Sequence, residues 1–124
     1  ASILEVEASP KDYAKVARVI ENRLALPMRL QLDSTVNYAL GIRDLQLSSD
    51  QLSKESDFNT YKVDGLPPTP IGNPGAAAIE AALEPAKGPW LYFVTVDPDN
   101  QITKFCVTYE DFLKLKAEFK RNVS

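Results

Sequence analysis

Residues 65–75 restrict the possible folds of this chain more than any other stretch. Four prolines and three glycines fall within these eleven residues. Proline fixes φ and lacks an N–H donor, so a helix interior or a central strand is excluded there. Large apolar side chains that favour burial occur before and inside the stretch, namely Phe58, Tyr61, Val63, Leu66 and Ile71. We therefore predict a rigid, extended Pro/Gly wall over residues 57–75, and not a flexible linker.

The residues upstream of this wall have the spacing of helices. A helix over residues 11–26 is predicted by an apolar stripe of 3.6-residue period, formed by Tyr13, Val16, Ala17, Ile20 and Leu24. Asp33 is a suitable N-cap for a short helix over residues 34–40, which Gly41 would end. This structural task is sufficient for Asp33, so we place capping above catalysis for it. Ser48 or Ser49 could cap another short helix.

The residues downstream of the wall predict a helix, a hairpin and a last helix. Asn73 as cap and Pro74 at the first helical position would begin an alanine-rich helix. Aromatic and β-branched residues on both sides of an Asp-Pro-Asp-Asn turn predict an antiparallel hairpin within residues 90–107. Thr108 would cap the final helix. The predicted fold class is α+β, with helices followed by the Pro/Gly wall, a late antiparallel β-hairpin and a C-terminal helix.

The length, the charge and the missing residue types limit the classes of function that this chain can have. A chain of 124 residues predicts a single domain over residues 1–124. A net charge of -3 without a basic run argues against a general nucleic-acid binder. The absence of histidine removes the commonest general base and metal ligand, and the single Cys106 excludes a cysteine-based zinc site. We predict no metal and no cofactor, and a packing role for Cys106. No apolar run approaches the length of a membrane span.

The first residues of the chain contain the clearest candidate for chemistry. In a helix, at about 100° per residue, Glu7 falls on the face of Ile3 and Leu4, whereas Glu5 points toward solvent. A carboxyl aimed at the interior tends to be protonated or paired, and a protonated carboxyl is what a general acid needs. A salt-bridged Glu7 or a frayed segment is the alternative. The segment begins without a cap residue, so we expect a fragment that starts inside a helix.

Motifs in a consistent order over nearly the whole chain resemble the endolytic murein transglycosylase family of bacteria, the MltG or YceG-like proteins. They include Ile3-Leu4-Glu5-Val6-Glu7, Asn22-Arg23-Leu24, Met28-Arg29-Leu30-Gln31 with Asp33, Asn59-Thr60-Tyr61, Gly65-Leu66-Pro67-Pro68, Asn73-Pro74-Gly75 and Leu91-Tyr92-Phe93. The family often has Gly-Met and Asp-Pro where this chain has Pro27-Met28 and Asp33-Ser34. We expect a local change at both places and not the loss of the site. The family has also carried the label of a pyridoxal-phosphate lyase, which no lysine context here supports.

The resemblance implies the C-terminal part of a lytic transglycosylase catalytic domain. Such an enzyme cleaves the β-1,4 bond between N-acetylmuramic acid and N-acetylglucosamine inside peptidoglycan strands and leaves 1,6-anhydromuramyl ends. A single glutamate, here Glu7, would act as acid and then as base. Sugar-binding candidates are Gln31, Tyr38, Asn59, Tyr61 and Asn73, each with a packing or capping role as the alternative. Asn22 and Arg23, otherwise a solvated last turn of their helix, would support the acid together with Asp33.

The family pattern also implies surroundings and partners. Its members are tied to the cytoplasmic membrane by one N-terminal helix and carry a LysM-like region, neither of which is in this sequence. We expect the full-length protein at the extracytoplasmic face of that membrane, the fragment in solution, and peptidoglycan synthases as partners. The alternative is a non-catalytic peptidoglycan-binding or scaffolding module of the cell-wall machinery. A purely structural domain would leave the wall and the inward Glu7 unexplained.

Overall fold

The structure, a computed structural model, describes residues 1–42 and 47–123. Its elements follow in chain order as α1 (Ser2–Glu7), the 3-10 turn η1 (Pro10–Asp12), α2 (Tyr13–Ala25), α3 (Asp33–Leu40), α4 (Ser49–Leu52), α5 (Ala76–Leu83), β1 (Tyr92–Asp97), β2 (Ile102–Cys106) and α6 (Tyr109–Val123). Helices, an antiparallel hairpin and a last helix are the predicted α+β class.

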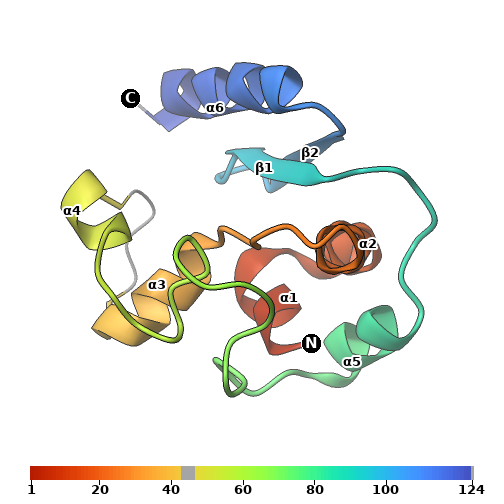
Figure 1. The fold of residues 1–124 in the computed structure, drawn as a ribbon. Coiled ribbons are helices and arrows are strands. Elements are labelled where there is room, and N and C mark those ends of the chain that lie inside the picture. The colour runs from red at the N-terminus through yellow and green to blue at the C-terminus, as the bar shows by residue number, and fades with distance from the viewer. Residues whose placement is uncertain (43–46, 124) are drawn as a thin grey trace.

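The hairpin lies between two helical layers (Figure 1). On one side α6 covers β1, where the Phe112 ring stacks on Tyr92 at a centroid distance of 4.9 Å. Asn122 secures the far end of α6, because its side-chain amide donates to the carbonyl of Val96 at 2.6 Å. On the other side lie α1, α2 and α5. The hairpin is therefore held from both faces and presents one of them to α1.

The short helix α1 lies at the centre of the core. Its Leu4 packs in one buried cluster with Tyr13, Val16, Ala17 and Ala78 of α2 and α5. Its neighbour Ile3 belongs to a second cluster with Leu30, Leu32 and Ile71. Two adjacent side chains thus anchor α1 on both sides. Full burial of each contributes about 1.5–3 kcal/mol to the free energy of folding. A helix of six residues would not form alone, so this packing determines its place.

Arg23 is buried in the last turn of α2 and Asn22 is half-buried, which corrects the interpretation of both as solvated. Arg23 is 7% exposed and donates hydrogen bonds to the carbonyls of Leu91 (2.6 Å), Arg29 (3.0 Å) and Leu30 (2.6 Å). The preceding Asn22 donates to two carbonyls just ahead of β1. Their partners lie up to 68 residues away in the sequence, so helical periodicity could not indicate them. Both residues fasten α2 to the start of the hairpin.

Two predicted helix starts are wrong. Asp33 is the first residue of α3 and not its cap, since Leu32 occupies the cap position without a side-chain hydrogen bond. Asn73 and Pro74 precede α5, which begins at Ala76 after the cap residue Gly75. Other termini are as predicted. Gly41 ends α3 with φ +70°, Ser48 forms a capping box before α4, and Thr108 accepts the N–H of Asp111 at 3.2 Å.

The Pro/Gly wall has no helix or strand, as its composition predicts, and it lies against the helices instead of extending away as a tether. Ile71 is buried, and its N–H donates to the hydroxyl of Ser2 at 3.1 Å. Thr60 is fully buried and its hydroxyl lies 2.9 Å from that of Thr35 on α3. Leu66 is 58% exposed, contrary to the expectation that it would be buried. Among the helices of the described ranges, none has the length and apolarity to cross a bilayer.

Candidate active site

Glu7 borders a small cavity between α1 and the hairpin. The cavity has a volume of about 190 Å³, and its lining comes from the end of α1 (Val6, Glu7, Ala8 and Ser9) and from the hairpin (Thr95, Pro98, Gln101 and Thr103). Glu7 is the last residue of α1, and one of its carboxyl oxygens accepts the backbone N–H of Ser34 at 3.2 Å. That N–H belongs to the first turn of α3, where the helix has free donors. The carboxyl is therefore held at the edge of a concave site.

The environment favours the protonated form of Glu7. Burial raises the pKa of Glu7, and the hydroxyl and backbone N–H of Ser34 partly oppose this by stabilising the carboxylate. The negative charge of Asp33 raises the pKa of Glu7 further. No ion pair of Glu7 occurs within the described residues, which removes the salt-bridged alternative there. A carboxyl with a raised pKa beside a cavity is a candidate proton donor.

Ser34 was not anticipated from the sequence as part of this site. Its side chain is 6% exposed, and its Oγ is buried without a hydrogen-bond partner of good geometry. Its position at the predicted start of a helix could have indicated free N–H donors, which favour a nearby carboxylate. The hairpin residues of the cavity gave no comparable signal, because their proximity to Glu7 depends on the tertiary fold.

Asp33 and Tyr61 form a hydrogen-bonded pair next to Glu7. The Tyr61 hydroxyl donates to Asp33 Oδ1 at 2.5 Å. Burial raises the pKa of Tyr61, and the charge and hydrogen bond of Asp33 raise it further. The charge of Glu7 has the same effect on Tyr61, and that of Arg23 the opposite one, so all four groups lie within electrostatic reach. This pairing explains why Asp33 does not cap α3, and it keeps Tyr61 as a protonated donor.

Glu5 is held on the opposite side of α1. One of its oxygens accepts the Tyr13 hydroxyl at 2.7 Å, and the other accepts the N–H of Gly75 at 2.6 Å. The hydrogen bond from Tyr13 lowers the pKa of Glu5 most, and that from Gly75 lowers it as well. Glu5 is thus an ionised group that joins α1 to α2 and to the start of α5, as its predicted outward position permits.

The predicted sugar-binding residues are not gathered in one place. Gln31 is exposed with φ +52°, and its N–H donates to the carbonyl of Thr60 at 3.2 Å. Tyr38 is 47% exposed, and its ring packs on Phe58 at 5.1 Å. Asn73 is exposed in the wall. The structure brings Glu7, Asp33 and Tyr61 together and places these other residues apart from the cavity lining.

Asn59 has a structural role in this fold. It is 1% exposed, and its amide nitrogen donates to the carbonyls of Leu52 at 3.0 Å and Lys54 at 2.6 Å. Its amide oxygen accepts the N–H of Tyr61 at 3.0 Å. A buried amide whose donors and acceptor are occupied has nothing left for a sugar. We do not retain Asn59 as a ligand, and of its two interpretations the packing role applies.

Within residues 1–42 and 47–123, no three acidic or cysteine side chains are grouped closely enough to hold a metal ion. The charged groups near the cavity are instead Glu7, Asp33 and the buried Arg23. Asp33 is engaged by Tyr61, and Arg23 by backbone carbonyls. Of these three groups, Glu7 alone lines the cavity, so its carboxyl is the one placed for proton transfer.

Known proteins resemble this chain over most of its length. The model of the YceG-like family matches residues 1–118. A protein of Bacillus subtilis (strain 168) named endolytic murein transglycosylase is 41% identical over 120 residues, which are 96% of this chain and 33% of that protein. A protein of the same name from Streptococcus pneumoniae serotype 2 is 36% identical over 100 residues, or 76% of this chain and 18% of that protein.

A solved structure agrees with the fold. The crystal structure of a yceG-like protein from Listeria monocytogenes superimposes with a TM-score of 0.84 at 43% sequence identity, covering 92% of this chain and 37% of that one. The chain therefore spans about a third of the length of the Bacillus and Listeria proteins. The family model, which covers almost the entire sequence, assigns the chain: it belongs to the YceG-like family.

Proposed function

We propose that this chain carries the catalytic carboxyl of a peptidoglycan lytic transglycosylase. The names of the Bacillus and Streptococcus relatives support this activity class. The single observation that carries the assignment to a residue is Glu7, a half-buried carboxyl with a raised pKa that borders a cavity and accepts the N–H of Ser34. The substrate is the glycan strand, cleaved internally between N-acetylmuramic acid and N-acetylglucosamine.

In the proposed reaction Glu7 first donates a proton and then accepts a different one. Protonated Glu7 donates to the oxygen that links the two sugars while the bond from the muramyl anomeric carbon to this oxygen breaks. The muramyl 6-hydroxyl oxygen then bonds to that anomeric carbon, and the Glu7 carboxylate accepts the proton of this hydroxyl. The products are a 1,6-anhydromuramyl end and a free N-acetylglucosamine hydroxyl. No water is consumed, and Glu7 ends in its starting state.

This reaction requires one carboxyl, whereas most glycosidases use two. Asp33, the carboxylate whose charge acts on Glu7, accepts a hydrogen bond from the Tyr61 hydroxyl and is thereby occupied. We assign Asp33 and Tyr61 a supporting role, in which the charge of Asp33 raises the pKa of Glu7 and the Tyr61 hydroxyl holds the Asp33 carboxyl in place. Ser34 has the complementary task, because its N–H stabilises the carboxylate that forms after the first transfer.

The products of intact peptidoglycan test the proposal. Incubation with the protein, followed by mass spectrometry, should give new chain ends that lack one water relative to reducing ends. Reducing ends would indicate a hydrolase and would contradict the lytic mechanism. Saccharide binding without product at any protein concentration would favour the non-catalytic binding or scaffolding module. The extracytoplasmic location and the synthase partners stay predictions.

A further inference from the structure

The hairpin gives the Glu7 cavity a second polar side. Thr95, Gln101 and Thr103 line the cavity there, whereas Glu7 and Ser9 are the polar residues on the side of α1. Pockets that hold drug-sized ligands have volumes of about 300–1,000 Å³. At about 190 Å³ this cavity is smaller, so only a short part of a sugar strand fits into it. The polar groups of the hairpin therefore face the same part of a ligand that Glu7 faces.

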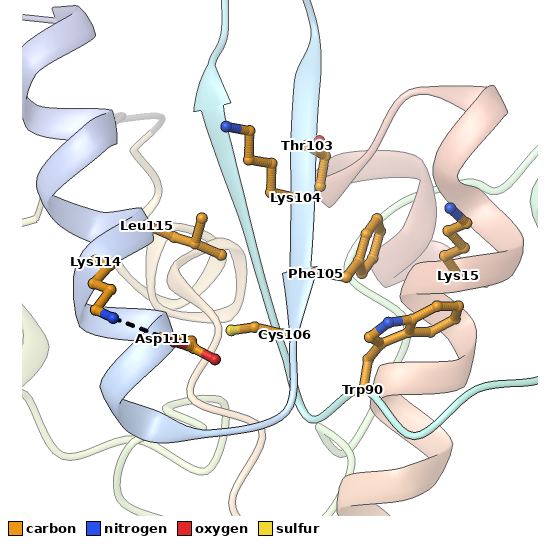
Figure 2. A pocket seen from close by; sticks show the side chains of 9 residues that line it. All are labelled: Lys15, Trp90, Thr103, Lys104, Phe105, Cys106, Asp111, Lys114 and Leu115. Atoms are coloured by element: carbon orange, nitrogen blue, oxygen red, sulfur yellow. Dashed lines mark ion pairs between the residues drawn. The ribbon is translucent and has the colours of Figure 1, made fainter.

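The two threonines form a hydroxyl pair with one unused proton. Thr95 of β1 and Thr103 of β2 are partners in the antiparallel register, and their Oγ1 atoms lie 3.0 Å apart. Figure 2 shows Thr103 on the side of β2 that faces α2, whereas Lys104 extends toward α6. A hydrogen bond between two hydroxyls uses one of their two protons. Within the described ranges neither hydroxyl has another hydrogen-bond partner, so one O–H stays available to a ligand.

Gln101 has a backbone conformation that its residue type does not favour. Its φ is +55°, in the left-handed region that glycine and asparagine adopt more readily than glutamine. Its N–H donates to the carbonyl of Pro98 at 3.2 Å, so the backbone alone closes the turn. The side chain is exposed and makes no hydrogen bond to the residues that the structure describes. The turn itself therefore gives no reason for a glutamine, and a strained residue at the edge of a cavity indicates a function for its side chain.

The proposed reaction determines which sugar group faces the hairpin. Glu7 acts at the anomeric carbon C1 and at the 6-hydroxyl of the same sugar. In the ring, C1 is flanked by C2 on one side and by the ring oxygen, followed by C5 with its C6, on the other. A sugar whose C6 side is turned to Glu7 thus directs its C2 substituent away from Glu7. In peptidoglycan this substituent is an N-acetyl group, which stays the same when a peptide is attached to the lactyl group.

We propose that Gln101 and the Thr95–Thr103 pair bind the 2-acetamido group of the sugar whose bond lies at Glu7. The unused threonine hydroxyl donates to the acetamido carbonyl, and the Gln101 amide oxygen accepts the acetamido N–H. The hairpin thereby selects N-acetylated sugars over those with a hydroxyl at C2. The inference rests on the proposed function, because the reaction at Glu7 sets the orientation of the sugar.

Calorimetric titration of two neutral tetrasaccharides tests this selection. The Glu7→Gln protein is titrated with β-1,4-linked tetramers of N-acetylglucosamine and of glucose, which differ only in the group at C2. The N-acetylated tetramer should bind about tenfold more tightly, the effect of one to two net hydrogen bonds. Equal affinities, or no binding of either sugar, would overturn the inference.

Two variants assign the selection to the hairpin. In the same Glu7→Gln background, Thr103→Val keeps the shape of the side chain and removes its hydroxyl, so the preference should fall by about fivefold. Lys104→Met is the control, since its side chain lies on the other face of β2 and pairs with Glu118. It should leave the preference intact. A preference that survives Thr103→Val would contradict the role of the hydroxyl pair.

Gln101→Gly gives a result that a purely structural residue would not give. Glycine relieves the left-handed strain, so thermal unfolding should move to higher temperature. The preference for the N-acetylated tetramer should nevertheless fall. A lower Tm would mean that the Gln101 side chain stabilises the turn, and an unchanged preference would remove it from the site. Calorimetry measures binding without turnover, whereas the products of peptidoglycan report catalysis, so failure of this inference and failure of the catalytic proposal are distinguishable.

Discussion

On one side of α1 the Glu5 carboxylate accepts hydrogen bonds from Tyr13 and from the backbone of Gly75. On the other side the Glu7 carboxyl is half-buried and accepts the N–H of Ser34 at 3.2 Å. The same residue type, two positions apart in a helix of six residues, therefore has its pKa lowered in one case and raised in the other. Environments that separate two pKa values in this way suit one carboxyl to act as an acid, here Glu7, and the other to remain an ionised structural group, here Glu5.

The contacts of Glu5 indicate a structural role for this glutamate. Glu5 joins α1 to α2 and to the start of α5, and thereby orients the helix that presents Glu7. Because Glu5 is ionised and doubly hydrogen-bonded, it is poorly suited to donate a proton. Glu7 is suited to donate one, but its burial opposes ionisation and so lowers stability at neutral pH. The following experiments test whether Glu5 and Glu7 have these different roles.

The largest effect should come from removing each carboxyl in turn. Glu7→Gln should lower the rate of anhydro-end formation by 10²-fold or more, the usual contribution of a positioned acid or base being about 10²–10⁴. Glu5→Gln, the matched control two residues away, should retain most of the rate per folded molecule. Mass spectrometry of peptidoglycan digests measures both. Equal loss in the two variants would break the division of roles.

Folding stability should respond to the same two variants with opposite signs at neutral pH. The raised pKa of Glu7 means that its stabilising contribution is complete below the unfolded value of 4.5 and is lost as the pH rises through the folded value. Glu7→Gln should therefore raise Tm by a few degrees at pH 7 and change little at pH 4. The lowered pKa of Glu5 gives a contribution that is present above 4.5 and lost as the pH falls through the folded value, so Glu5→Gln should lower Tm at pH 7.

Thermal unfolding followed by circular dichroism at several pH values gives these curves. If Glu5→Gln and Glu7→Gln change Tm in the same direction at pH 7, the stability of α1 depends on the loss of either carboxyl alike. That result would contradict the different environments that the contacts of Glu5 and Glu7 indicate.

Ser34→Ala should shift the pH dependence of activity. The hydroxyl of Ser34 lowers the pKa of Glu7, so its removal raises that pKa further. Because the reaction starts from protonated Glu7, the decline in rate at high pH should move to higher pH. Ser48→Ala, which removes the cap of α4, should leave the profile in place. A shift of the Ser34→Ala profile toward lower pH would contradict the assignment.

The smallest effect is expected on the Glu5 side. A Cβ at Gly75 would lie 3.2 Å from a Glu5 oxygen, which is close enough to strain the hydrogen bond between them. We expect Gly75→Ala to cost about 0.5 kcal/mol in the free energy of unfolding, measured by urea denaturation. The control is Gly72→Ala, whose Cβ would meet Val6 at an ordinary 3.8 Å. If Gly72→Ala lowers the free energy of unfolding as much as Gly75→Ala, the effect would come from adding any side chain to the Pro/Gly wall and not from the hydrogen bond to Glu5.

Local features of the sequence predicted the parts of the fold that local forces determine. The aromatic and β-branched runs specified the hairpin, Ser48 and Gly41 specified helix ends, and the 100° period placed Glu7 inward and Glu5 outward. In each case the deciding interaction lies within a few residues, so the pattern contains it.

The remaining features depend on partners that are distant in the sequence. Asp33 would cap α3 if nothing competed, but the Tyr61 hydroxyl, 28 residues later, takes its carboxylate. Asn59 resembled a sugar ligand because its type is suitable, yet three backbone groups of the folded chain occupy its amide. Ser34 and the hairpin side of the cavity likewise became visible only with the tertiary fold.

The cavity at Glu7 has its two sides on separate segments, one on α1 and one on the hairpin, so its width depends on how firmly these segments are joined. Both segments are joined to α2: Leu4 of α1 packs on it, and Arg23 of α2 donates to the carbonyl of Leu91 just before β1 and to the carbonyls of Arg29 and Leu30. Displacement of reacting groups by about 1 Å can reduce a rate 10²-fold. If Glu7 is the acid, the positioning of its substrate depends in part on Arg23, a core side chain that is not in the lining of the cavity.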